Sequence, residues 1–389
     1  MQRYIYISVI LFLSFYQYAL ALPKTETENL RKHYPVSVSM GGKVNNVPFD
    51  SGNVVNVQLG LPCSRINNLN GFGFNLISGN VTEQMKGLSI SGINSINKQG
   101  MLGANIAGLL TYTQNRGEGV LITGGLNVLY GQMRGLQLSG VSNFNIGKVK
   151  GVQISGISNF NATGVNGFQL SALNNVAGGE MKGMQLSGFL NVSMDDMHGV
   201  QLGIVNYAKR VKGAQIGVIN ASGRSVKGVQ LGIINYSYDT ARVQLGLVNM
   251  NPKTRINGII YGGNMTAINF GIRFMNRYTY SILAVGYPYD HNVADFSGAF
   301  TYRYGLHKAY RRFTFSADLG YSHINLVSAK EHIDVPNTLW SVQARGNISF
   351  RICKYFGVFV TGGYQYAAKY GTFDSYRHKP LYEFGVSFF

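Results

Sequence analysis

A short motif recurs along the first two thirds of the chain. Its unit is a glycine followed by alternating apolar and polar residues, as in GVQISGISN (Gly151 to Asn159). The glycine is repeated at intervals of 16 residues: Gly71, Gly87, Gly103, Gly119, Gly135, Gly151, Gly167, Gly183 and Gly199. Gly213, Gly228 and Arg242 continue the series at spacings of 14 or 15 residues. Alternation at every second position predicts β-strands.

A fixed short period predicts a solenoid. A unit of 14–16 residues cannot bury its own apolar face, so it must stack on its neighbours. We therefore expect a stacked β-solenoid of about twelve coils over residues 56–250, with two short strands in each coil. A second apolar residue recurs two places before the glycine, for example Val149 and Met181, and is expected to help fill a thin core.

Two kinds of amide residue recur in the same register. The glutamines are Gln137, Gln153, Gln169, Gln185, Gln201, Gln215, Gln230 and Gln244. The asparagines are Asn143, Asn159, Asn175, Asn191, Asn206, Asn220, Asn235 and Asn249. Amides both donate and accept hydrogen bonds, so rungs about 4.8 Å apart would satisfy one another. Recognition of a sugar polymer is the alternative, but ladders account for every copy without a ligand.

The residue before the repeat glycine is often basic and forms a candidate anion-binding column. Its members are Lys86, Arg134, Lys150, Lys182, Lys212 and Lys227. His198 shares the column, and Asn166 and Ala241 interrupt it. Like charges about 5 Å apart repel one another, so an anionic polysaccharide or lipopolysaccharide would stabilise the column. The alternative is that exposed lysines keep the solenoid soluble and prevent edge-to-edge pairing.

Residues 255–389 have a different pattern and predict a second domain. They hold 29 of the 48 aromatic residues and eight segments with strand-like alternation. Eight antiparallel strands form the smallest usual membrane β-barrel. The alternation predicts that these side chains face lipid: Phe300, Tyr302, Tyr304, Tyr382, Phe384, Val386 and Phe388. The lumen would hold Thr301, Arg303, Glu383 and Ser387.

The N-terminus predicts secretion. Residues 1–21 contain a basic start, an apolar stretch and Ala19-Leu20-Ala21, which is typical of a signal peptide cleaved after Ala21. Residues 22–55 form a polar lead-in that is expected to cap the first coil. Cys63 and Cys353 are too few for a disulfide scaffold or a zinc cluster, and we expect both to be buried small hydrophobes.

Composition excludes several classes of protein. The 389 residues include 50 glycines, which disfavours helix bundles. Only 13% of the residues are charged, about half the usual fraction, so uncharged polar side chains supply the polarity. The net charge of +18 is spread along the chain and predicts contact with anionic envelope surfaces rather than nucleic acid.

No common catalytic motif is present. The histidines of the C-terminal region are His291, His307, His323, His332 and His378. Ser322 and His323 are adjacent, and adjacent strand residues point to opposite faces, so they cannot form a catalytic pair within one strand. We therefore predict a non-enzymatic protein without a cofactor or metal. A lipid-modifying barrel hydrolase is the alternative.

The chain ends in Phe388-Phe389 and resembles outer-membrane β-barrel proteins, whose last strand usually ends in an aromatic residue. The GVQLSG-x-x-N units resemble bacterial surface-repeat proteins. These resemblances imply the outer membrane of a Gram-negative cell and no activity. With an even number of strands, both barrel ends would lie in the periplasm, which would place the array there.

We therefore predict an all-β outer-membrane protein with a structural, adhesive or envelope-glycan-binding role, in contact with membrane lipid. The alternative architecture makes the repeats strands of one large barrel, which would form a pore or transport channel.

Overall fold

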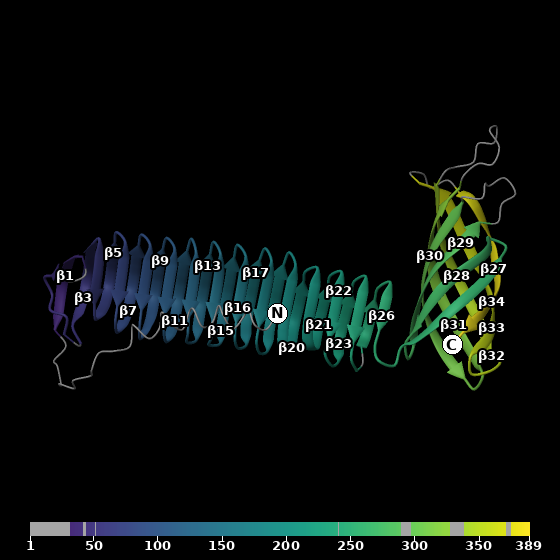
Figure 1. Ribbon diagram of the computed structural model, residues 1–389, viewed down its shortest axis with the longest axis horizontal. Helices are drawn as coiled ribbons and strands as arrows, with labels where there is room; N and C mark the ends of the chain where they lie inside the picture. The colour runs from purple at the N-terminus through teal and green to yellow at the C-terminus, as the bar shows by residue number, and fades with distance from the viewer. Residues whose placement is uncertain are drawn as a thin grey trace.

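The computed structural model describes residues 32–41, 44–50, 52–239, 241–288, 297–326, 338–370 and 375–389. Every regular element within these residues is a β-strand, so the predicted all-β class is confirmed (Figure 1). No helix in these ranges is long and apolar enough to cross a membrane. The predicted signal peptide, with Ala21, lies outside the described residues, as do His291 and His332.

The repeats form the predicted solenoid, in which a longer and a shorter parallel ladder face each other. The longer strands are β1 (His33–Met40), β3 (Val54–Leu61), β5 (Asn68–Asn75), β7 (Gln84–Ser91), β9 (Gly100–Ala107), β11 (Arg116–Thr123), β13 (Met133–Ser139), β15 (Val149–Ser155), β17 (Val165–Ser171), β19 (Met181–Ser187), β23 (Val226–Leu231) and β25 (Ala241–Leu245). The shorter strands are β4 (Cys63–Ile66), β6 (Ser78–Val81), β8 (Asn94–Asn97), β10 (Leu110–Thr113), β12 (Leu126–Leu129), β14 (Ser142–Asn145), β16 (Ser158–Asn161), β18 (Asn174–Ala177), β22 (Ile219–Ser222), β24 (Ile234–Ser237) and β26 (Val248–Met250).

Three strands depart from this scheme. Strands β20 (Leu190–Leu202) and β21 (Val205–Ile216) each run through both ladders. Strand β2 (Val44–Asn45) pairs antiparallel with β1, which in turn stacks on β3. Both β1 and β2 lie within the polar lead-in, so part of that segment extends the array by a further rung.

Equivalent residues of successive coils lie directly over one another. Gly135 pairs with Gly151, and Gly151 pairs with Gly167. Gly151 has a φ of +143°, and a Cβ added there would lie 1.9 Å from the carbonyl oxygen of Gly135. A side chain at this position would therefore collide with the backbone of the coil before it, which explains why the period is marked by glycine.

The interior of the array is largely polar. All eight repeat glutamines except Gln244 are completely buried, and the repeat asparagines are buried as well. The Gln153 amide nitrogen donates to the Gln137 side-chain oxygen at 2.6 Å, and the Gln169 nitrogen donates to Gln153 at 3.0 Å. Asn159 donates at 2.8 Å both to Asn175 and to the carbonyl of Leu170. The predicted amide ladders are therefore confirmed.

The apolar residues divide into two sets. The column two places before the glycine, which includes Met133, Val149, Val165 and Met181, is buried and forms the hydrophobic core of the array. The apolar residues that alternate with the glutamines point outward instead. Stacking was expected to bury the apolar face of each unit, but apart from this column only scattered residues such as Leu121 and Leu129 are covered, because the amides occupy the interior.

The C-terminal region closes into the predicted eight-stranded antiparallel barrel. Its strands are β27 (Arg255–Gly263), β28 (Thr266–Met275), β29 (Thr279–Pro288), β30 (Gly298–Tyr310), β31 (Phe313–Asn325), β32 (Thr338–Arg351), β33 (Phe356–Lys369) and β34 (Ser375–Phe388). Strand β27 pairs with both β28 and β34, which completes the ring. The barrel is separate from the parallel ladders, so the interpretation of the repeats as strands of one large barrel is wrong.

The array joins one end of the barrel and docks against its outer wall. Residues 251–254 connect β26 to β27. The Tyr302 and Tyr304 hydroxyls, on the outward face of β30, donate to the carbonyls of Gly246 at 2.7 Å and Gln244 at 2.8 Å. Figure 1 shows the array extending sideways from the barrel, with its long axis across the direction of the barrel strands.

We predict that Gln153→Leu destabilises the array by at least about 2 kcal/mol, because the buried side-chain nitrogens of Gln169 and Asn161 lose the oxygen to which they donate. Urea unfolding followed by circular dichroism measures this change. The exposed Lys150→Gln in the same coil is the matched control and should change little. The only tryptophan, Trp340, lies in the barrel, so its fluorescence transition should stay unchanged. Equal stability of the two variants would contradict a ladder that supports the fold.

Candidate functional site

Charged residues of the array are confined to one edge. From Gly71 to Asp239, every Asp, Glu, Lys, Arg and His lies between the end of a shorter strand and the next repeat glycine. This charged edge holds twelve Lys and Arg against six Asp and Glu, so it is net positive. All six residues of the predicted basic column lie on it, and all six are exposed.

The column is less continuous than its sequence pattern indicates. Leu102 and Glu118 occupy the same register between Lys86 and Arg134. Arg134 lies 3.8 Å from the Glu118 carboxylate, and Lys182 lies 3.1 Å from Glu180. Within the described ranges, no ion pair is found for Lys86, Lys150 or Lys227, whereas Lys212 lies 3.9 Å from Asp196. Three of the six members thus keep an unpaired charge.

Acidic residues neutralise the edge most fully at the coil formed by β20 and β21. The Lys209 ammonium donates to Asp195 at 2.9 Å, and the Arg210 guanidinium donates to Asp196 at 2.5 Å. The hydrogen bond from Lys209, together with its charge, lowers the pKa of Asp195 below its ordinary value. The hydrogen bond to Asp196 raises the pKa of Arg210. Both pairs are solvent-exposed, so they contribute little to stability.

The opposite edge of the array is apolar. Most of its turns carry a large hydrophobic residue that is more than one-third exposed, although the turn at Gly124-Gly125 has none. These residues are Ile93, Leu109, Val141, Ile157, Leu173, Phe189, Ile204, Val218 and Ile233. The outward residues of both ladders continue this surface, for example Phe144, Phe160 and Met184. One coil therefore has an amide interior, a charged edge and an apolar remainder.

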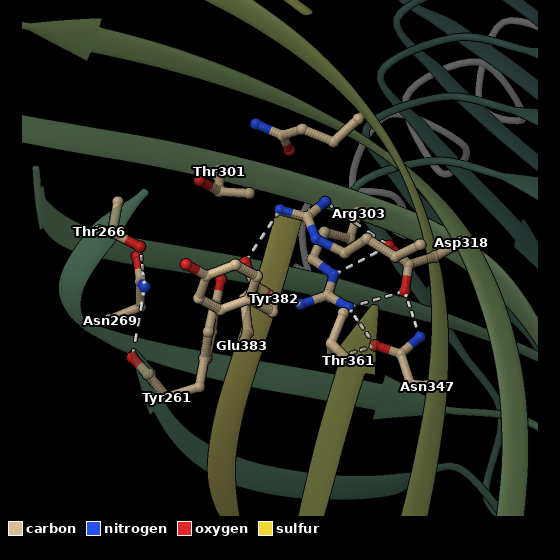
Figure 2. A network of polar contacts seen from close by, with 12 residues as sticks. Tyr261, Thr266, Asn269, Thr301, Arg303, Asp318, Asn347, Thr361, Tyr382 and Glu383 are labelled. Carbon is tan, nitrogen blue, oxygen red and sulfur yellow. Dashed lines mark hydrogen bonds and ion pairs between the residues drawn. The ribbon is translucent and has the colours of Figure 1, made fainter. Parts of the chain in front are cut away.

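The lumen of the barrel holds a buried cluster of four charges (Figure 2). Arg303 donates to both carboxylate oxygens of Asp318, at 2.9 and 2.8 Å, and to Glu383 at 3.2 Å. Arg345 donates to Glu383 at 3.2 Å and lies 3.7 Å from Asp318. All four side chains are at most 3% exposed. We call Arg303, Asp318, Arg345 and Glu383 the lumen quartet; its formal charges cancel.

Neutral side chains complete the polar filling around the lumen quartet. Asn347 accepts from Arg303 and donates to Asp318, both at 2.8 Å, and Tyr280 donates to Asp318 at 2.5 Å. The predicted division of the barrel strands is confirmed, because Thr301, Arg303, Glu383 and Ser387 are buried. The exposed residues include Phe300, Tyr382, Phe384 and Phe388. Tyr302, Tyr304 and Val386 are also outward and half-buried. Alternation predicts that Arg303 and Glu383 face the lumen, but no pattern in the sequence indicates which of the four charges pair with one another.

The residues considered for catalysis do not come together. The Ser322 side chain is buried in the lumen and bonds to Thr301 and Gln343. His323 lies on the outer face, where its ring nitrogen is 2.7 Å from the Tyr370 hydroxyl. The His378 side chain lies outside the described residues, and His307 lies near the short-turn end of β30.

The expectation for the cysteines is wrong. Cys63 is half-buried, Cys353 is exposed, and both are free thiols. Cys63 is on β4 near the start of the array, whereas Cys353 is in the turn between β32 and β33, at the opposite end of the molecule (Figure 1). Neither position is in a core, because β4 presents Cys63 at its outer face and the turn is at the surface.

We predict that Glu383→Gln destabilises the barrel by about 3–5 kcal/mol, since it leaves two buried guanidinium groups facing one carboxylate. Arg345→Met in the same chain should recover much of this loss, because it restores charge balance. Unfolding followed by Trp340 fluorescence measures both variants. Additive losses in the double variant would argue against coupling within the quartet.

No family model and no curated protein sequence matches the chain. Among solved structures, the chain is similar to the N-terminal β-barrel domain of Pseudomonas aeruginosa OprF, with 12% sequence identity and a TM-score of 0.28. The similarity covers 34% of this chain and 95% of that domain.

Proposed function

We propose that this is an outer-membrane protein whose barrel anchors the repeat array in the periplasmic leaflet, where the array has a structural, non-enzymatic role. One observation carries the proposal: each coil is polar inside and apolar outside except at its charged edge. A coil exposed to water on all sides would present this apolar surface to solvent. Contiguous exposed apolar surface of this extent is typical of membrane or partner contacts.

The barrel has the features of a membrane anchor. It is closed, so its strands leave no unpaired edge, and its outward residues are mainly aromatic and aliphatic. A bilayer cannot satisfy backbone polar groups, which is why only closed sheets and helices cross it. The lumen quartet and its neutral partners fill the interior, which favours an anchor over a channel.

The lengths of the connections between barrel strands support one orientation of the barrel in the outer membrane. The connections at the end that joins the array are residues 276–278, 311–312 and 352–355. Two connections at the other end are much longer, residues 289–297 and 326–337. Outer-membrane barrels have short periplasmic turns and longer extracellular loops. This supports an array on the periplasmic side and disfavours a role in adhesion at the cell surface.

The contacts between the last coil and β30 support a position for the array within the membrane, between the short-turn end and the middle of the barrel. The end of the barrel with the short turns is the end at which β30 finishes, and Tyr302 lies farther from it than Tyr304 does. The Tyr302 hydroxyl donates to the carbonyl of Gly246, which is in the apolar turn of the last coil. Tyr302 precedes Tyr310, the end of β30, by eight residues, or roughly 20 Å along the axis of a barrel with strands tilted by about 40°. The apolar edge therefore points toward the bilayer centre and the charged edge toward the periplasm.

The dimensions of a coil fit one leaflet. The extended stretch from Gly135 in β13 to the turn at Gly140 measures about 17 Å at 3.3 Å per residue. Half of a hydrocarbon core is about 15 Å thick. The net positive edge would then lie among headgroups, where unpaired Lys86, Lys150 and Lys227 could contact lipid phosphates. Anionic lipid, or the phosphates of lipopolysaccharide if the array faced that leaflet, is the partner that this arrangement favours.

We predict negligible conductance when the purified protein is inserted into planar bilayers, because side chains occupy the lumen. Steps of porin size would contradict the anchor. A variant with both Arg303 and Asp318 changed to alanine keeps the charge balance but opens space in the lumen, and it serves as the positive control for a detectable leak.

The position of the array is tested with single cysteines in a chain whose native cysteines are replaced by serine. Ile157→Cys is on the apolar edge and Lys148→Cys is on the charged edge nearby. A fluorophore at position 157 should be strongly quenched by nitroxide-labelled lipid, and one at position 148 much less.

In whole cells, an impermeant maleimide should label position 148 only after the outer membrane is permeabilised. Labelling of intact cells would contradict the orientation. Equal, weak lipid quenching at both positions would contradict insertion. Quenching that is weak only at position 157 would indicate that a second copy of the array covers the apolar edge, and it would also overturn insertion.

A further inference from the structure

A second charged region lies at the mouth of the barrel, where the array joins it. Here the last coil and the short-turn end of the barrel enclose a cavity of about 660 Å³. The lining residues come from the array, from the 251–254 connection and from seven barrel strands with their turns. A volume of this size is in the range of small-molecule sites.

The lining of this mouth cavity is strongly basic. Its cations are Lys253, Arg255, Arg273, Arg277 and Arg351, and His307 also lines it. Asp239 is the only acidic residue among its lining residues. None of the five cations forms an ion pair with any residue that the structure describes. Unlike the lumen quartet, whose charges cancel, this cluster has five cationic side chains against one acidic side chain and is net positive.

Arg273 is the member that indicates a ligand. It projects from β28 into the lumen and is only 7% exposed. Its buried Nε has no hydrogen-bond partner. Leaving a buried guanidinium without a counter-ion costs free energy, so such groups are normally paired. The Nδ1 atom of His307, in the same lining, is also buried without a partner, while its Nε2 is 2.7 Å from the Asn276 carbonyl.

The chemistry of the lining selects a phosphoryl group. Guanidinium groups bind phosphate through paired N–H donors, and four of the five cations are arginines. Several arginines around one ligand favour a tetrahedral oxyanion, whose oxygens can accept hydrogen bonds from more than one side, over a planar carboxylate. Met275, Phe350 and Phe389 supply apolar surface in the same cavity, which suits the chain of an amphiphile beside its headgroup.

We infer that the mouth cavity is a binding site for a phosphoryl group, supplied either as inorganic phosphate or as the phosphate of a lipid headgroup. Arg273 forms the buried end of the site, and Arg277 and Arg351 lie nearer solvent, each stacked on an aromatic ring, Tyr278 and Phe389 respectively. The site depends on the barrel and its junction with the array. It does not require the array to lie in a leaflet.

The test uses the full chain in dodecyl maltoside, which carries no phosphate. Calorimetric titrations are made with inorganic phosphate and, separately, with dihexanoyl phosphatidylglycerol below its micelle concentration. We expect saturable binding of at least one probe, weakened about tenfold or more by Arg273→Met, because charge-assisted hydrogen bonds are lost. Lys150→Gln, which removes an unpaired cation outside the cavity, should bind as the native chain does.

The two probes distinguish the source of the phosphoryl group. Binding of phosphate alone supports a soluble ligand, and binding of the lipid alone supports a headgroup. No saturable binding of either probe, or equal binding by the native chain and the Arg273→Met variant, overturns the site. Arg351→Gln, at the rim, provides a second variant if Arg273→Met does not fold, and it too must weaken binding.

Thermal unfolding separates a binding role from a structural one. Without phosphate, Arg273→Met should unfold at a higher temperature than the native chain, because it removes an unpaired buried charge. Phosphate should raise the Tm of the native chain and leave that of the variant unchanged. A lower Tm for the variant, with no effect of phosphate on the native chain, would mean that Arg273 only supports the fold and would overturn the proposal.

Discussion

The buried amide ladders determine how the rest of the array is arranged. Within a strand, alternate residues point to opposite faces, so placing Gln153 inside places Val152 and Ile154 outside. An amide is stable in the interior only if its neighbours satisfy it, and the coil before and the coil after do so. Each coil therefore depends on two neighbours of the same sequence. The apolar exterior follows from this satisfied polar interior and is not an independent feature.

The barrel also combines a polar interior whose groups satisfy one another with an apolar outer face, but its interior is held by ion pairs instead of amide ladders. Its lumen is polar, and the lumen quartet pairs two guanidinium groups with two carboxylates from four different strands. Its outer face is apolar, as is most of the outer face of the array. At the junction the two surfaces meet, and the Tyr302 and Tyr304 hydroxyls satisfy backbone carbonyls of the last coil. Both domains thus present apolar surface on the outside, and the contact between them leaves that surface continuous.

Period and alternation are properties of the sequence, so the coils, the ladders and the eight barrel strands could be predicted from it. Alternation gives two faces but does not say which one is inside. In the barrel, aromatic residues opposite Arg303 and Glu383 resolve this choice, whereas in the array the apolar and amide faces are equally regular. The confinement of charge to one edge was a signal that could have resolved it. The mouth cavity depends on residues distant in sequence, and no spacing connects Lys253 to Arg351.

The shortened repeats near the barrel give the junction its geometry. From Gly199 onward the period falls to 14 or 15 residues, and copies such as GVQLGIVN lack the serine that precedes the turn in GVQISGISN. The ladders continue without a break, since Gln215 donates to Gln201 and Asn206 donates to Asn220 at normal distances. The deletions fall at the ends of the longer strands, which have 7 residues in β15 and 5 in β25, and in the turns. A longer strand end or apolar turn in the last coil would move its backbone relative to Tyr302, so the length of this part of the coil sets the height at which the array meets the barrel wall.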